Sequence, residues 1–310
     1  MNVLSLFDGM SCGRIALDKL GIKVNNYFAA EIDKFAIKVS KANYPEIKHI
    51  GDVTQIKGKD LPQIDLLIGG SPCQGFSFAG KQLNFDDPRS KLFFEFVRLI
   101  EECKPKYFLL ENVKMKKEYQ DLISQYLKVE PIEINSALVS AQNRKRLYWT
   151  NIPNISQPED KGVILRDILE DGSPATVAKD NVVIFDKHKD GFKFSKDGLC
   201  HAGDANLKGN DSIKRVYHPY GKGPTVTTMG GGHREPKVLV IKNETIKEEE
   251  TTSPNNYNGV TYRKMTPLEC ERLQTVPDNY TNHVSNSQRY KMLGNGWTVD
   301  VITHILKGID

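Results

Sequence analysis

Short apolar runs alternate with amphipathic stretches through the first half of the chain. Runs of this length that are rich in β-branched and aromatic residues are typical of buried strands, and apolar residues at helical spacing between them predict helices. The predicted strands are Val3–Phe7, Tyr27–Ala30, Ile64–Ile68, Tyr107–Leu110, Ile132–Ile134 and Leu147–Ile152. A regular alternation of strands and helices predicts an α/β fold, with a parallel sheet covered by helices on both faces.

Three helices are expected between these strands. Arg14–Leu20 is followed by Gly21, a residue type that is common just after the end of a helix. Asp33 is a helix-capping residue, and the helix that it caps extends to about Ala42. Ser90–Cys103 carries apolar residues at helical spacing and predicts a longer helix.

The alternation stops near Pro153, and the chain then stays polar and rich in Gly, Asn, Asp and Lys to about Gly259. This composition predicts a smaller and irregular unit. Regular secondary structure is expected again from Thr266-Pro267, where a helix begins. The apolar face of Thr298–Leu306 is expected to pack back on the first unit. The predicted domains are a large one from residues 1–155 plus 275–310 and a small one from residues 156–274.

The chain carries no sequence signal for a membrane or for secretion. No apolar run approaches the roughly 20 residues that span a bilayer, and the first strand has no basic segment before it as a signal peptide would. The five cysteines form no Cys-x-x-Cys pair and no metal-ligand spacing. Free thiols in a reducing compartment, a cytoplasmic location and the absence of a metal are therefore expected.

Positive charge is concentrated in one part of the chain. The net charge is +4, and Lys187–Lys237 holds ten Lys and Arg against five Asp and Glu. Such an excess suits contact with phosphates, although a solvated basic face has the same composition. The four histidines in this segment are irregularly spaced, which favours polar surface groups over metal ligands.

The end of the first strand has the features of a nucleotide-binding turn. It is followed by Phe7-Asp8-Gly9-Met10-Ser11-Cys12-Gly13, in which Gly9 and Gly13 permit a tight turn and close approach of a ligand. The spacing differs from the Gly-x-Gly-x-x-Gly pattern of dinucleotide sites. Glu31 closes the second strand, where a carboxylate can bind ribose hydroxyls, and Asp52 follows the third, where it can accept from an adenine amino group. These positions predict an adenosyl ligand.

Further sequence blocks follow in a fixed order. They are Pro72-Cys73-Gln74, Glu111-Asn112-Val113, Gln142-Asn143-Arg144-Lys145-Arg146, Arg263 with Pro267 and Arg272-Leu273-Gln274, and Gln288-Arg289-Tyr290-Lys291 with Gly294-Asn295. Together with the first turn, Glu31 and Asp52, these blocks make the chain resemble the DNA (cytosine-5)-methyltransferase family of bacteria and phages. Only residues 155 to 255 lie mostly outside the part of the chain that resembles the family. This resemblance implies a Rossmann-like, class I S-adenosylmethionine-dependent methyltransferase fold with a small target-recognition domain.

The resemblance implies a covalent reaction at Cys73. Its thiolate adds to carbon 6 of a cytosine, so that carbon 5 becomes able to accept the methyl group of S-adenosylmethionine. Glu111 holds a proton at ring nitrogen 3 and accepts from the exocyclic amine, which requires a protonated carboxyl at least transiently. Arg146, and more loosely Arg144, bind the carbonyl oxygen of the base and attract the thiolate. A water or a side chain takes the carbon-5 proton.

The resemblance also implies cofactor contacts from Phe7, Pro72, Leu92 and Asn295, in addition to those expected of Gly9, Gly13, Glu31 and Asp52. The chain departs from the family at one point. Where Gly-Asn-Ser-Val or Gly-Asn-Ala-Val is common, it has Gly294-Asn295-Gly296-Trp297. Trp297 either closes over the cofactor or fills core, and the sequence does not decide between these roles.

The expected nucleic-acid contacts are implied by family position. Gln74–Lys91 is predicted to be a mobile loop that closes on the minor-groove side of DNA, with Gln74, Lys81 and Arg89 in contact with it. Thr225, followed by Val226, occupies a position that supports the backbone of the flipped strand. Arg215 contacts a guanine edge, binds phosphate or is structural, and these alternatives stay open.

The expected partner is double-stranded DNA, bound in a cleft between the two domains of a monomer. A cognate restriction endonuclease is expected to act in the same system without a stable complex, unless the enzyme is an orphan. A transfer-RNA methyltransferase of the same chemistry and a catalytically inactive DNA-binding homologue are the alternatives. A nicotinamide oxidoreductase is not favoured, because the chain lacks the glycine pattern of that class and Pro72-Cys73-Gln74 would have no function in it. The recognition sequence is not readable from these residues.

Overall fold

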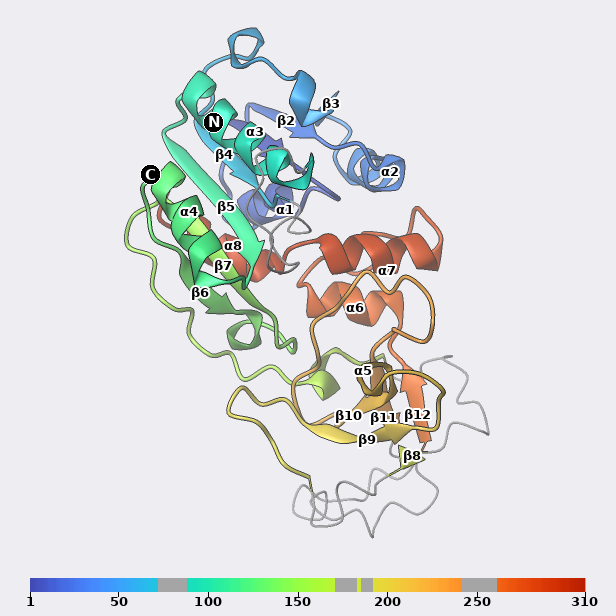
Figure 1. The fold of residues 1–310 in the computed structure, drawn as a ribbon. Helices are drawn as coiled ribbons and strands as arrows, with labels where there is room; N and C mark the ends of the chain where they lie inside the picture. The colour runs from blue at the N-terminus through green and yellow to red at the C-terminus, as the bar shows by residue number, and fades with distance from the viewer. Residues whose placement is uncertain (72–87, 171–182, 185–191, 241–260, 310) are drawn as a thin grey trace.

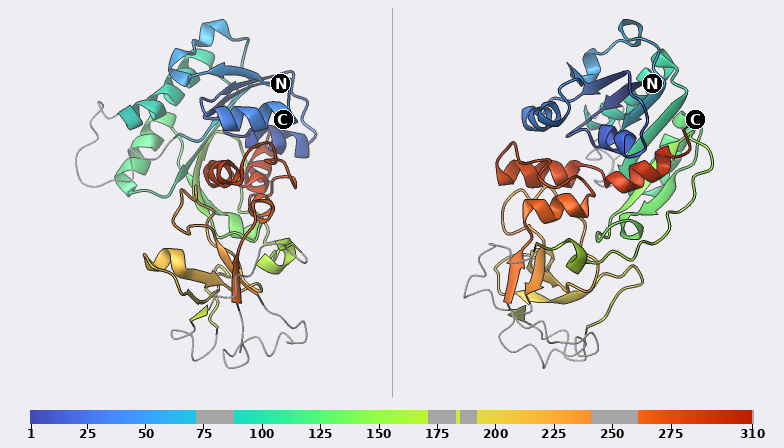
Figure 2. Two further views of the ribbon diagram at one scale, coloured as in Figure 1. Left: turned by 90° about the vertical axis from the view of Figure 1, so that its right-hand side faces the viewer. Right: turned by 180° about the vertical axis from the view of Figure 1, so that it is seen from behind.

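The computed structural model describes residues 1–71, 88–170, 183–184, 192–240 and 261–309. Two β-sheets lie at opposite ends of this described part, with two helices between them (Figure 1). The views in Figure 2 show the same arrangement from the side and from behind, and they place the two termini close together on the larger sheet. In the described part of the chain, no helix is long and apolar enough to cross a membrane.

The larger sheet has the strand order β3-β2-β1-β4-β5-β7-β6. Its strands are β1 (Asn2–Leu6), β2 (Asn26–Ala30), β3 (Lys48–Gly51), β4 (Leu66–Gly69), β5 (Tyr107–Val113), β6 (Ile132–Asn135) and β7 (Lys145–Thr150). Neighbouring strands from β3 to β5 are parallel, and β7 is antiparallel to both β5 and β6. The reversal occurs because β6 and β7 are joined without a helical crossover, which only antiparallel strands allow. The predicted mostly parallel sheet is confirmed.

Helices cover both faces of this sheet. The helices are α1 (Cys12–Lys19), α2 (Lys34–Asn43) and α8 (Val299–Leu306) on one face, and α3 (Pro88–Cys103) and α4 (Lys117–Leu127) on the other. Successive strand residues alternate between the faces, so Val3 packs in the core under the first group and Leu4 in the core under the second. Helix α8 packs on α1, which confirms the predicted return of the C-terminal segment to the first unit.

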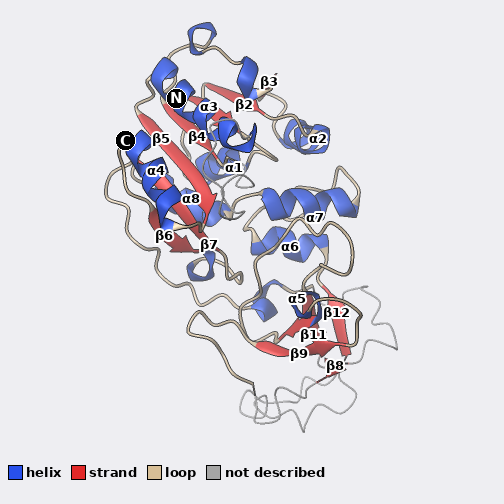
Figure 3. Ribbon diagram, in the orientation of Figure 1, coloured by secondary structure: helices blue, strands red, loops and turns tan. Residues whose placement is uncertain are grey.

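The smaller sheet is more regular than the sequence indicated. It has the order β12-β11-β10-β9-β8 and packs over a separate core (Figure 3). Its strands are β8 (Val183–Ile184), β9 (His201–Ala205), β10 (Arg215–Tyr217), β11 (Lys237–Val240) and β12 (Thr261–Lys264), with the one-turn helix α5 (Asp211–Lys214) before β10. These strands are too short for an alternating pattern to be visible, so the sequence did not indicate this sheet. The predicted domain boundaries stay a prediction.

Two helices join the sheets. They are α6 (Pro267–Leu273) and α7 (Asn286–Asn295). Thr266 caps α6 with its hydroxyl oxygen, Glu269 completes the capping box, and Pro267 occupies the first turn. The predicted start of this helix is therefore confirmed, as is the capping of α2 by Asp33, whose carboxylate accepts from the amide of Phe35.

Candidate active site

The turn after β1 is held in a tight left-handed conformation. Phe7, Gly9 and Ser11 all have positive φ, at 56°, 60° and 66°. The amide of Gly9 donates to Oε2 of Glu31 across 2.7 Å, which ties the turn to the end of β2. A Cβ on Gly9 would meet nothing within 4 Å, so the backbone here is open to a ligand. Phe7 is partly buried against the core on the α3 side.

Gly13 has a packing role that the sequence did not reveal. A Cβ at this position would overlap the side chain of Ile68 and lie 3.0 Å from the hydroxyl of Tyr27. Only glycine therefore lets α1 pack this closely on the sheet. The predicted contact between Gly13 and the cofactor stays a prediction.

Glu31 orders the backbone around it. Its Oε1 accepts from the amides of Ile32 and Asp33, each at 2.8 Å, so the carboxylate is fixed where β2 ends. Ile32 beside it is 75% exposed, which is unusual for a large apolar side chain and leaves it free to cover an aromatic ring. Sequence analysis missed Ile32. Asp52 accepts from the amide and hydroxyl of Thr54, both at 2.9 Å, and caps a short helix.

A buried hydrogen-bond network lies behind the turn. Asp8 accepts from the hydroxyls of Ser11 and Tyr27, and Ser11 is hydrogen-bonded to Ser40, whose hydroxyl lies 3.2 Å from Nε2 of His49. Burial raises the pKa of Asp8 to about 6 in spite of these donors. The network fixes the turn from the side opposite the open backbone of Gly9. Asp8 and Ser11 stood in the sequence block, but Tyr27, Ser40 and His49 come from other elements, and their contacts were not predictable.

Glu111 lies within β5 at the centre of the predicted catalytic group. Its side chain is buried, at 8% exposure for the residue. Arg146 on β7 forms an ion pair with it, with Nε 3.0 Å from Oε1 but without hydrogen-bond geometry. The indole N–H of Trp297 donates to Oε2 across 3.2 Å. The structure thus brings Glu111 and Arg146 together as predicted, and it adds Trp297.

Asn112 holds the backbone that leads to the predicted nucleophile. Its Nδ2 lies 3.4 Å from the carbonyl oxygen and 3.3 Å from the hydroxyl of Ser71, to both of which it donates. Ser71 follows β4, which pairs with β5, so the chain enters the next segment beside Glu111. The predicted site residues Pro72, Cys73, Gln74 and Lys81 lie outside the described residues, as does most of the predicted loop. Arg89 belongs to the first turn of α3.

Arg144 is buried among backbone carbonyl groups. Its guanidinium donates to the carbonyl oxygen of Val226 at 3.0 Å and to those of Gly294 and Gly296 at 3.2 and 3.0 Å. Burial and the nearby charge of Arg146 lower its pKa to about 10. These contacts make Arg144 a link between the sheets, and the predicted contact of Arg144 with a base stays a prediction.

The predicted target-recognition core is anchored to the same block. Thr225 donates from its hydroxyl to the carbonyl oxygen of Asn143 at 2.7 Å. The amide of Val226 donates to Oε1 of Gln142 at 2.8 Å. The carbonyl oxygen of Val226 accepts from Arg144, so both the amide and the carbonyl group of Val226 are fixed. The two sequence blocks are therefore in direct contact in the structure.

The remaining predicted residues lie farther from this centre or at its rim. Arg215 is exposed at the start of β10 and lines a hollow of about 310 Å³ with His201, Asp204 and Tyr217. Leu92 is partly buried on α3 against the core, and Asn295 is exposed at the end of α7. The structure does not decide among the alternatives for Arg215.

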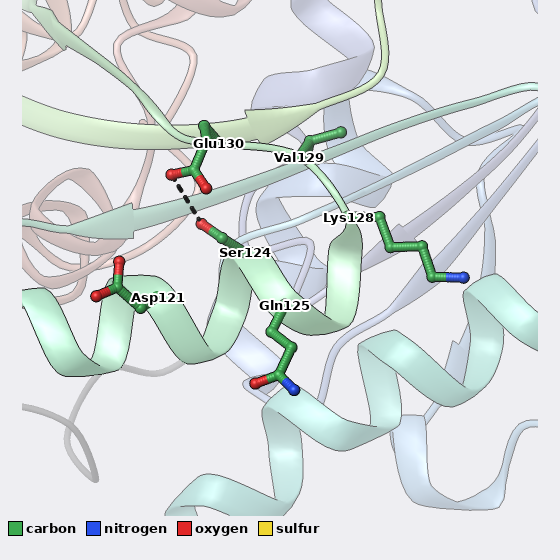
Figure 4. A pocket seen from close by; sticks show the side chains of 6 residues that line it. All are labelled: Asp121, Ser124, Gln125, Lys128, Val129 and Glu130. Atoms are coloured by element: carbon green, nitrogen blue, oxygen red, sulfur yellow. Dashed lines mark hydrogen bonds between the residues drawn. The ribbon is translucent and has the colours of Figure 1, made fainter.

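A second hollow is not part of this site. It has a volume of about 480 Å³ and lies at the end of α4 (Figure 4). Its lining residues are Asp121, Ser124, Gln125, Lys128, Val129 and Glu130. None of the predicted site residues lines it, and the catalytic groups described above come from other elements. Over the described ranges, no cluster of His, Cys, Asp and Glu is able to hold a metal ion.

Comparison with known proteins identifies the family. A family model described as C-5 cytosine-specific DNA methylase matches residues 1–310. The chain belongs to this family. The resemblance seen in the sequence is thus confirmed, and the protein is a DNA (cytosine-5)-methyltransferase that uses S-adenosylmethionine.

Relatives of the methyltransferase come from restriction-modification systems and phages. It is 35% identical to the type II methyltransferase M1.ScrFI of Lactococcus lactis subsp. cremoris over 97% of this chain and 75% of the relative. It is 29% identical to the orphan methyltransferase M.SPBetaI of Bacillus phage SPbeta over 99% of this chain and 97% of the relative. A solved putative DNA modification methyltransferase encoded in an E. coli prophage has the same fold, with a TM-score of 0.67, 23% identity and coverage of 100% and 98%.

Proposed function

We propose that the methyltransferase modifies carbon 5 of a flipped-out cytosine in a specific sequence of double-stranded DNA, through a covalent adduct with Cys73. The observation that supports this most is the buried carboxylate of Glu111. It lies on β5 beside the end of β4, which leads directly to Cys73, and it is paired with Arg146. A buried acid with a cationic partner at the ends of adjoining strands is the arrangement that recognition of a cytosine ring requires.

Each protein group has a defined task in this reaction. The thiolate of Cys73 forms a bond to carbon 6, and the ring electrons move toward carbon 5. Glu111 holds a proton at nitrogen 3 and accepts from the exocyclic amine, which limits the negative charge that builds up in the ring. Arg146 stabilises the charge near the carbonyl oxygen of the base. After methylation, loss of the carbon-5 proton to a water or a side chain allows the carbon–sulfur bond to break and releases Cys73.

The turn after β1 and the end of β2 fit an adenosyl cofactor. Gly9 leaves its backbone open, Glu31 presents a fixed carboxylate to the ribose, and exposed Ile32 offers an apolar surface to the adenine. Asp52 binds the adenine amino group, and Phe7, Gly13, Pro72, Leu92 and Asn295 complete the proposed contacts. When bound, S-adenosylmethionine supplies an electrophilic methyl group.

The second sheet is proposed to carry the DNA specificity. Thr225 supports the backbone of the flipped strand, because its hydroxyl and the Val226 peptide are fixed to Gln142-Asn143-Arg144. Arg215 reads a base or binds a phosphate, and Gln74, Lys81 and Arg89 contact the duplex near the flipped base. The protein acts as a monomer in the cytoplasm of a bacterium or an infected host, alone or beside a restriction endonuclease that it does not bind stably.

Trapping with 5-fluorocytosine DNA tests this proposal. The fluorine cannot leave as a proton does, so the wild-type protein with S-adenosylmethionine is expected to form a complex that survives denaturation. Cys73→Ser is expected to form none, and Glu111→Gln to form it at least 100-fold more slowly. Bisulfite sequencing of a plasmid from expressing cells gives the recognition sequence. Methylation of transfer RNA but not of duplex DNA would replace the proposal with the RNA alternative, and absence of any complex would favour an inactive homologue.

A further inference from the structure

We propose that Trp297 is a positioning residue for the catalytic carboxylate. Its indole N–H, 3.2 Å from Oε2 of Glu111, orients this carboxyl group toward the base. The inference rests on the proposed role of Glu111. This role also explains the departure of the chain from the common family pattern. Trp297 stands where that pattern has a valine, and a valine side chain has no hydrogen-bond donor.

The contact between Trp297 and Glu111 is buried and closely packed. Trp297 and Glu111 are each only 8% exposed. A Cβ on Gly70 would lie 2.9 Å from Nε1 of Trp297 and 3.0 Å from Oε2 of Glu111, so the backbone after β4 closes the third side. On the far side of the indole, a Cβ on Gly13 would lie 3.6 Å from Cζ3. The indole therefore has no room for another rotamer without displacing backbone.

The backbone on either side of Trp297 is also fixed. The carbonyl oxygen of Gly296 accepts from Arg144 at 3.0 Å and from Gln274 at 3.1 Å. The hydroxyl of Thr298 accepts from Ser136 and donates to Oε1 of Gln274, both at 2.8 Å. Trp297 is thus held by groups from the block at Arg144 and from the end of α6.

The chemistry of the two partners explains why a tryptophan suits this position. An indole N–H is a hydrogen-bond donor only. It therefore binds the carboxylate through one of the lone pairs of the carboxylate oxygen, and it has no acceptor of its own. It leaves the second lone pair of Oε2 for the base. Arg146 on Oε1 is a charged partner without hydrogen-bond geometry and does not fix the rotation of the carboxyl plane. A directed neutral donor fixes that plane and adds no charge to the site.

A pair of matched variants separates this role from simple core packing. The chain has two tryptophans. The other, Trp149 on β7, is fully buried, and its indole N–H donates to the hydroxyl of Ser124 at 3.0 Å in the core on the α4 side. Trp297→Phe and Trp149→Phe each remove one buried indole N–H and a similar volume. Both are expected to lower stability, but only Trp297→Phe removes a donor from Glu111.

The measurements are kcat, KM and the pH profile of methyl transfer to duplex DNA. Trp297→Phe is expected to lower kcat about tenfold with little change in KM for S-adenosylmethionine, as loss of one directed hydrogen bond in the transition state would. Trp149→Phe is expected to keep the wild-type kcat and profile.

The outcomes distinguish the inference from the proposal on which it rests. If wild type forms no covalent complex with 5-fluorocytosine DNA, the proposed function fails first. If wild type forms it, and Trp297→Phe matches Trp149→Phe in kcat and pH profile, the positioning role is wrong while the proposed function stands. In a Trp149→Phe background the fluorescence of Trp297 alone is visible. It is expected to change on Glu111→Gln, and an unchanged spectrum would also contradict the contact.

Discussion

The phenol of Tyr27 donates a 2.8 Å hydrogen bond to Oδ1 of Asp8, so the acid in the turn after β1 is anchored to the neighbouring strand β2. Asp8 is buried, and its pKa is raised from 3.8 to about 6, mainly because burial disfavours its charge. The turn after β1 is thus built on a carboxyl group that is costly to ionise. This relationship has a measurable consequence for stability.

We expect Asp8→Asn to remove part of the pH dependence of folding. A folded-state pKa above the unfolded value means that the native state binds more protons between pH 3.8 and about 6. Stability from Asp8 is therefore fully present below pH 3.8 and is lost as the pH rises through about 6. The total is about 3 kcal/mol, at roughly 1.4 kcal/mol for each pH unit. Urea unfolding of both proteins from pH 4 to 7 measures this difference.

The difference between the two proteins isolates Asp8, because His49 at the end of the same network titrates in both. Burial lowers the pKa of His49, so its contribution to stability changes in the opposite direction as the pH falls. The free energy of unfolding of Asp8→Asn relative to wild type is expected to rise with pH up to about 6 and then to level off. A difference that is constant from pH 4 to 7 would show that Asp8 does not titrate in this range.

Gly294→Ala is expected to separate α7 from the target-recognition core. A Cβ at this position would overlap the backbone of Thr227 and the amide of Thr228, which cannot move as a flexible side chain can. The expected cost is about 3 kcal/mol, at the upper end of overpacking effects. Gly230→Ala is the control, because a Cβ there would meet nothing within 4 Å and its φ is not left-handed. It is expected to change stability by less than about 0.5 kcal/mol in urea unfolding.

The sequence predicted the parts of the fold in which local pattern and tertiary structure agree. Apolar runs located β1 and β2 closely, whereas β5 extends three residues beyond Tyr107–Leu110, and β7 begins and ends two residues earlier than Leu147–Ile152. Helix α4 was missed although Tyr119, Ile123 and Leu127 recur every fourth residue. The five-stranded second sheet was missed because its strands are two to five residues long.

The candidate site was predicted in its residues but not in its connections. Blocks in order indicated Glu111 and Arg146, and the structure places them in contact. The contact of Trp297 with Glu111 joins residues 186 positions apart, and no local pattern carries such information. Arg144 was predicted beside Arg146 because the two belong to one block of the family resemblance. Whether a guanidinium faces a base or backbone carbonyl groups depends on the packing of a distant segment.

Arg263 and Glu269 join the second sheet to α6, and we expect Arg263→Lys to weaken this joint. Both guanidinium nitrogens donate to the carboxylate, at 2.8 and 2.6 Å, and Glu269 is fully buried. A lysine cannot form two parallel hydrogen bonds, so a loss of about 2 kcal/mol is expected, and Arg263→Ala is expected to lose about 3–5 kcal/mol. Lys117→Ala, which breaks an exposed pair with Asp121, is the control and should leave the free energy of unfolding close to that of wild type. Equal losses in all three variants would contradict the prediction.

Arg144→Ala tests whether this arginine supports the site or touches the base. Removal of the guanidinium leaves the carbonyl groups of Val226, Gly294 and Gly296 without this donor in a buried place. The expected cost is about 3 kcal/mol or more in urea unfolding, because each buried acceptor that loses its donor costs about 1–3 kcal/mol. Lys145→Ala, which removes the neighbouring partly exposed partner of Asp197, is expected to cost less than about 1 kcal/mol. An Arg144→Ala protein as stable as wild type but without methyl transfer would instead indicate direct contact with the base.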